Sequence, residues 1–146
     1  MTSNSTAVRA PREKRRTSVE GGKSEEKNAT TVHSIPRAIL AGVDGLTPSD
    51  LDRLPFGVIQ LDRSGTILRF NEYEANLSNR RAPETIGKNF FEDVAPCTDV
   101  RDFHGRFREG IEAGDLHVSF PFIFRFPRKA RRVDVTLYYS DETDTV

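Results

Sequence analysis

Hydrophobic residues alternate most regularly between Leu116 and Phe126. A period of two predicts a half-buried strand, and the buried face of its second half is aromatic. Pro121 lies on the opposite face and cannot donate a ladder hydrogen bond, which indicates an edge strand. Residues 133–139 follow as the return strand of a hairpin.

A second hairpin is predicted nearer the N-terminus. Residues 54–61 and 66–70 have strand character, and residues 62–65 between them (Asp-Arg-Ser-Gly) have turn chemistry. Asn71 follows as a helix cap, and Glu74 stands at capping-box spacing from it.

Two more helices are predicted between the hairpins. A short one covers residues 82–87, with a proline near its start and a glycine after its end. In a longer one, apolar residues recur at steps of three and four until Gly114: Val100, Phe103, Phe107 and Ile111.

The N-terminal third has a different composition. Residues 1–33 are rich in Ser, Thr, Glu, Lys and Arg, contain no aromatic residue, and are predicted to be a disordered tail. Residues 34–53 are a weakly helical lead-in that could lie across a sheet, and residues 54–146 form the domain proper. The order of elements is that of an α+β fold, a PAS domain, with helices on one face of an antiparallel sheet.

Composition and charge exclude several classes of protein. The formal net charge is zero, which argues against a dedicated nucleic-acid binder, and no apolar run is long enough to span a membrane. The histidines, His33, His104 and His117, stand far apart, so no metal site is expected. With no secretory signal and one free cysteine, a cytoplasmic location is expected.

That cysteine, Cys97, stands just before the predicted long helix, with Asp99 as the expected cap. The positive end of a helix would favour the thiolate and make Cys97 a better nucleophile. The alternative is a buried cysteine that acts as a small hydrophobe. A cysteine hydrolase would need a base nearby, and the sequence marks no acid to orient His104, so no enzyme is expected.

The residues around Cys97, from Ile86 to Asp99, resemble the chromophore-attachment segment of the photoactive yellow proteins. The resemblance extends without a gap from Leu54 to the end of the chain. It implies that Cys97 carries p-coumaric acid (4-hydroxycinnamic acid) as a thioester.

The resemblance also implies roles for other residues. Glu74 corresponds to the family's proton donor to the phenolate, although capping alone could explain a glutamate there. Ser78 and Arg80 match its neighbours, and Phe90 and Phe124 match aromatic residues near the pocket.

The chain departs from the family at several positions. Phe70 stands where a tyrosine usually donates a second hydrogen bond, and Arg128 replaces a methionine that assists recovery. Tyr73 could compensate for Phe70. The chain ends at Val146, where the family continues into a central strand, so the last strand is expected to be missing and self-association through two unpaired neighbours is possible.

The sequence therefore predicts a blue-light photoreceptor that signals to an unknown partner by isomerisation, proton transfer and partial unfolding of the lead-in. The alternative is a chromophore-free PAS module that senses a ligand or binds a protein. Basic residues crowd the last hairpin and could attract an anion, although solvated charge is the simpler interpretation: Arg125, Arg128, Lys129, Arg131 and Arg132.

Overall fold

The computed structural model describes the backbone of residues 6–11 and, with side chains, residues 32–126 and 128–146. Its centre is a five-stranded antiparallel sheet in the order β3-β2-β1-β5-β4. The strands are β1 (Thr6–Pro11), β2 (Gly57–Leu61), β3 (Ile67–Phe70), β4 (His117–Phe126) and β5 (Lys129–Tyr138). Both predicted hairpins, β2–β3 and β4–β5, are present, and β4 lies at an edge, as Pro121 indicated.

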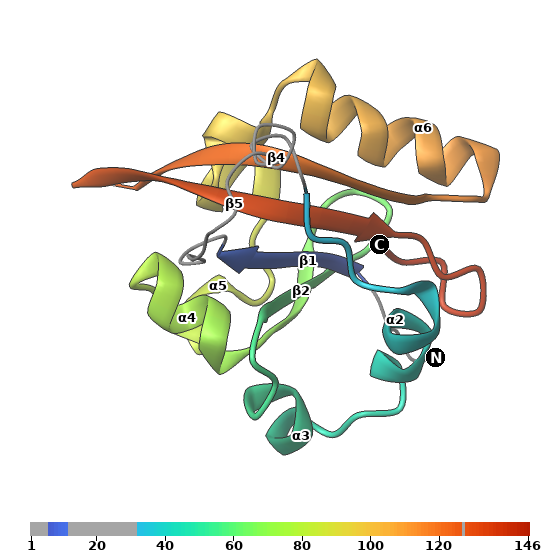
Figure 1. Cartoon of the computed structure of the whole chain (residues 1–146), viewed down its shortest axis with the longest axis horizontal. Coiled ribbons are helices and arrows are strands. Elements are labelled where there is room, and N and C mark those ends of the chain that lie inside the picture. Colours follow the sequence, from blue (N-terminus) through green and yellow to red (C-terminus); the bar gives the residue numbers. More distant parts are fainter. Residues whose placement is uncertain (1–5, 12–31, 127) are drawn as a thin grey trace, which may run out of the picture.

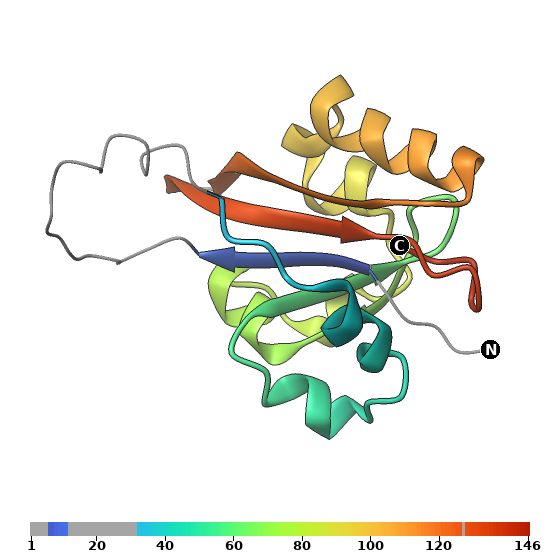
Figure 2. The same ribbon diagram turned by 45° about the vertical axis from the view of Figure 1, so that its right-hand side comes forward.

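The central strand, β1, comes from the segment that was predicted to be disordered. Thr6–Pro11 pairs on one side with β2, where Val8 lies opposite Val58, and on the other with β5, where Val8 lies opposite Thr136. Figures 1 and 2 show β1 between these two strands. The prediction of disorder is thus corrected for these residues, because paired backbone groups on two sides offset a poor hydrophobic pattern. The rest of the predicted tail, up to residue 31, lies outside the described residues.

The expectation of two unpaired strands also needs correction. No strand follows Tyr138 within the described residues, but β1 pairs with both β2 and β5 in the centre of the sheet. Further along β2, the backbone of Val146 exchanges hydrogen bonds of 2.7 and 3.0 Å with Leu61. The premise for self-association through these two strands is therefore removed.

Helices cover both faces of the sheet (Figure 1). On one face, α4 (Glu72–Ser78), α5 (Ala82–Thr85) and α6 (Arg106–Ala113) enclose the main core. On the other, α2 (Arg37–Val43) and α3 (Pro48–Asp52) form a smaller cluster against Val58, as expected for a lead-in that lies across the sheet.

Three short helical turns connect α5 to α6: η1 (Phe90–Val94), η2 (Pro96–Thr98) and η3 (Arg101–Gly105). Of these, η1 and η2 were not predicted, and η3 replaces the first part of the predicted long helix. Both have wide turns of the π type, which apolar spacing does not distinguish from an α-helix.

Asp44, at the C-terminal end of α2, makes the stability of the lead-in depend on pH. Burial and the nearby Glu142 raise the pKa of Asp44 to about 6. Since the unfolded group has the lower pKa of 3.8, stability is lost as the pH rises from about 4 to about 6. Asp44→Asn should therefore raise Tm at pH 7.5. Because Asp44 is partly exposed, we expect a reduced effect of about 1 kcal/mol, or 2–4 °C.

Thermal melts at pH 4.5 and pH 7.5 measure this effect. Asp141→Asn is the matched control, since Asp141 is exposed. Equal stabilisation by Asp44→Asn at both pH values would contradict the assignment.

Candidate functional site

Cys97 lies in the middle of the short turn η2 and is half-buried, with a free thiol. The turn is held by its own hydrogen bonds: the Thr98 hydroxyl donates to the carbonyl of Ala95 (2.7 Å), and the Asp99 amide donates to that of Pro96 (3.0 Å). The next helical segment, η3 continued by α6, begins at Arg101 with Val100 as its N-cap. Cys97 therefore lies before the first turn of this helix and is not one of its capping residues, which weakens the helix-dipole argument.

A cavity of about 560 Å³ opens beside Cys97. Its wall includes Ser78, Arg80 and Phe124, so the structure brings four of the predicted site residues together. Phe124 is almost fully buried and reaches the cavity from β4. The guanidinium of Arg80 donates to the carbonyl of Val94 (3.0 Å) and ties the end of α4 to η1.

The other predicted site residues lie deeper and are not part of the cavity wall. Glu74 is fully buried in the first turn of α4, and Phe70 and Phe90 belong to the main core. Ser78 connects the cavity wall to the more deeply buried Glu74, because its hydroxyl donates to the backbone carbonyl of Glu74 (2.8 Å). The structure thus places Glu74 one helical turn behind the cavity wall.

Asn71 caps α4, as predicted. In a full capping box the Asn71 amide would donate to the Glu74 carboxyl group, but here it donates elsewhere. The Asn71 side-chain oxygen accepts the amide of Glu74 (3.2 Å), whereas the Asn71 amide donates to the carbonyl of Val58 (3.1 Å). The Glu74 carboxyl group is therefore not needed to cap the helix, which weakens the capping explanation for a glutamate there.

The Asn71 side chain also joins the lead-in to the site. Its oxygen also accepts the amide of Val58 (2.9 Å), and its nitrogen donates to the carbonyls of Leu51 (2.8 Å) and Phe56 (3.0 Å). Asn71 is buried and bonds to α3, β2 and α4 at once. The helix-cap signal found this residue but not these connections.

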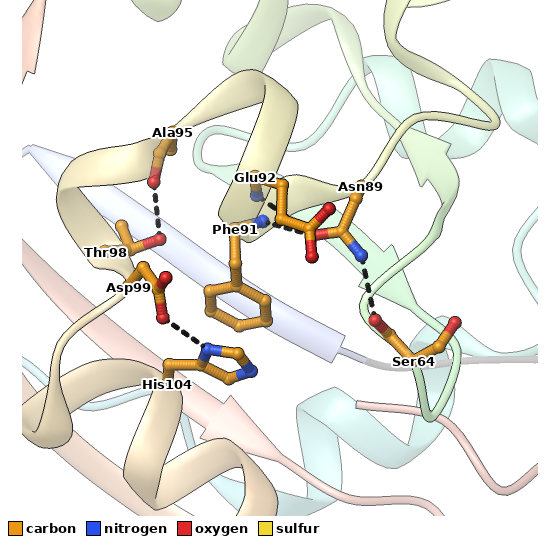
Figure 3. A network of polar contacts seen from close by, with 8 residues as sticks. All are labelled: Ser64, Asn89, Phe91, Glu92, Ala95, Thr98, Asp99 and His104. Carbon is orange, nitrogen blue, oxygen red and sulfur yellow. Dashed lines mark hydrogen bonds and ion pairs between the residues drawn. The ribbon is translucent and has the colours of Figure 1, made fainter.

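Polar contacts around the Cys97 turn were not predicted from the sequence (Figure 3). The His104 ring nitrogen Nδ1 and the Asp99 carboxylate are 2.8 Å apart, and the imidazole stacks on Phe91 with ring centroids 3.8 Å apart. Asn89 caps η1 by accepting the amides of Phe91 and Glu92. Asp99 thus pairs with His104 instead of capping the next helix. The only sequence feature that could have indicated this pair is the five-residue spacing between Asp99 and His104.

Several alternatives find no support in the described residues. An acid does orient His104, contrary to expectation, but no hydrogen bond joins His104 to Cys97 within residues 32–126 and 128–146. Among the same residues no cluster of side chains could hold a metal ion, and no helix is long and apolar enough to cross a membrane.

The antiparallel sheet, the short turns around a pocket and the long hairpin define the class of the domain. Residues 49–142 match the family model of the PAS fold. The fold predicted from the order of elements is confirmed.

Comparisons with known proteins narrow this class. The chain is 48% identical over 87 residues to the photoactive yellow protein of Rhodothalassium salexigens, covering 60% of this chain and 70% of the relative. It is 46% identical over 90 residues to that of Halochromatium salexigens, covering 62% and 72%. The crystal structure of the photoactive yellow protein domain from the sensor histidine kinase Ppr of Rhodospirillum centenum matches with a TM-score of 0.69 and 40% identity, covering 72% of this chain and 92% of that one.

The chain belongs to the photoactive yellow protein family. It is a photoreceptor domain of PAS fold and not an enzyme, as predicted.

Proposed function

We propose that this domain is a blue-light receptor that carries p-coumaric acid as a thioester on Cys97. The observation that supports this most is the cavity beside Cys97, because it brings the thiol together with Ser78, Arg80 and Phe124. A partly accessible thiol next to an aromatic wall suits an aryl acyl group. When bound, this group would supply absorption of visible light and a change of shape about its double bond.

The residues around the cavity would perform separate tasks. The Sγ atom of Cys97 would hold the acyl group, and Phe124 would provide an apolar wall. Arg80, fixed by the carbonyl of Val94, would restrict the entry of water. Glu74 would hold a proton at its carboxyl group, because complete burial favours the neutral form.

Loss of that proton would leave a charge in the core, at a cost of several kcal/mol. Asn71 bonds both to the amide of Glu74 and to the carbonyl of Leu51 in the lead-in. Local unfolding of α2 and α3 would relieve the charge and form the signal.

Reconstitution with activated p-coumaric acid tests the proposal. We expect a yellow product and a mass increase on Cys97 that hydroxylamine removes. A colourless product, or a label on another residue, would favour a PAS module that binds no chromophore.

Glu74→Gln should keep the colour but slow proton transfer after a light flash by roughly 10²-fold, since an amide has no proton to give at neutral pH. Transient absorption measures this rate. Glu84→Gln is the matched control, because Glu84 is an exposed carboxyl group in the wall of the same cavity. Equal rates in wild type and Glu74→Gln would assign Glu74 a structural role.

Phe70→Tyr should stabilise the anionic chromophore. A hydrogen bond to a charged acceptor is worth roughly 1.5–3 kcal/mol, so the midpoint of the visible band in a pH titration should fall by about one to two units. An unchanged midpoint would show that another donor, with Tyr73 the first candidate, already serves the phenolate.

A further inference from the structure

A second hollow, of about 680 Å³, is also lined by Cys97. We name it the hairpin groove. Besides Cys97, it is lined by Val100, Pro121, Phe122, Ile123, Arg125 and Arg132. Most of these residues come from β4 and β5, and β4 is an edge strand.

The hairpin groove has a strongly basic border. Arg125 and Arg132 line it and are exposed, and three further cations stand near the end of the same hairpin: Arg128, Lys129 and Arg131. Within the part of the chain that the structure describes, none of these five forms an ion pair. Among the described residues this positive charge has no acidic side chain paired with it, and it would favour an anionic partner.

The interior of the groove is apolar. Ile123 and Val100 remain 50% and 45% exposed, and Pro121 lines the groove with them, so the exposed apolar side chains form a patch. Aliphatic surface next to cations fits a partner that offers carboxylates and apolar side chains together.

This chemistry favours one class of partner over others. Single-stranded nucleic acid is bound by several aromatic side chains that stack with successive bases, whereas the lining of the groove includes one aromatic residue, Phe122, which is only partly exposed. An acidic polypeptide segment with aliphatic side chains matches both the cations and the aliphatic side chains of the groove.

The groove is also connected to the cavity of the proposed chromophore. Cys97 and Arg125 line both hollows. A change in the group held by Cys97 would therefore alter the wall of the groove directly.

We propose that the hairpin groove is a docking surface for an acidic, leucine-bearing polypeptide segment, and that light changes its affinity. The second part rests on the proposed function, whereas the first does not need a bound chromophore.

The first experiment uses the full chain and two fluorescein-labelled peptides, one of glutamates with interspersed leucines and one of glutamates alone. Fluorescence anisotropy should show tighter binding of the leucine-bearing peptide. Arg125→Glu/Arg132→Glu should weaken it by about tenfold or more. Ile123→Ser should weaken the leucine-bearing peptide and leave the all-glutamate peptide unchanged.

Lys88→Glu/Arg108→Glu is the matched control. It changes the net charge equally at exposed positions outside the groove. This control should change the Kd of the leucine-bearing peptide by less than about twofold. Equal losses in both double variants, or tighter binding of phosphatidylserine vesicles or a single-stranded oligonucleotide, would overturn the docking surface.

The second experiment repeats the titration with the chromophore-loaded protein in darkness and in blue light. We expect a change in Kd of about threefold or more. Equal affinities would overturn the coupling to light. Failure to bind chromophore would contradict the proposed function and leave the peptide result with the unloaded chain intact.

Discussion

Cys97→Ala will abolish covalent attachment of the chromophore and all visible absorbance after reconstitution. Cys97 provides the only thiol in the chain, since the sequence contains one cysteine. The fold should survive, because the hydrogen bonds of the turn come from the Thr98 hydroxyl and the Asp99 amide, not from Sγ. Absorption spectra, intact mass and thermal melts measure these outcomes.

Cys97→Ser is the matched control for shape. It keeps the size of the side chain, but a hydroxyl is a much weaker nucleophile than a thiolate, so it should also stay colourless. A yellow product from Cys97→Ala would refute the attachment site.

Deletion of residues 1–11 will destabilise the domain severely. This deletion removes β1, which pairs with β2 on one side and with β5 on the other. Each lost backbone hydrogen bond costs about 1 kcal/mol, and both neighbours become open edges. We expect self-association, or a fall in Tm of about 10 °C or more.

Deletion of residues 1–5 is the control for this truncation, since it leaves β1 in place. Sedimentation velocity and thermal melts distinguish the two proteins. A stable monomer without residues 1–11 would show that β1 contributes little to the sheet.

Local pattern predicted the hairpin β4–β5 well because its information lies within neighbouring residues. Alternation from Leu116 to Phe126 identified the strand, and Pro121 identified the edge. For β1 no such information exists. Thr6–Pro11 has little hydrophobic pattern, and its pairing with β5 joins residues more than a hundred positions apart, which local propensity cannot show.

The candidate site was predictable for a different reason. The resemblance to the photoactive yellow proteins identified four site residues, Cys97, Ser78, Arg80 and Phe124. The structure brings these four side chains around one cavity. Glu74 was named too, but its position behind the wall depends on how α4 packs. The pairing of Asp99 with His104 was missed because η3 replaces the expected helix start.

Asn71 has a consequence for the order of events after light absorption. Its side chain holds the carbonyl of Leu51 in the lead-in and the amide of Glu74 in α4. All its hydrogen-bonding groups are engaged, so it cannot follow a movement of α4 without giving up a bond to α3. If the lead-in detaches as proposed, we therefore expect rearrangement at Glu74 and detachment of the lead-in to share one time constant, with no intermediate between them.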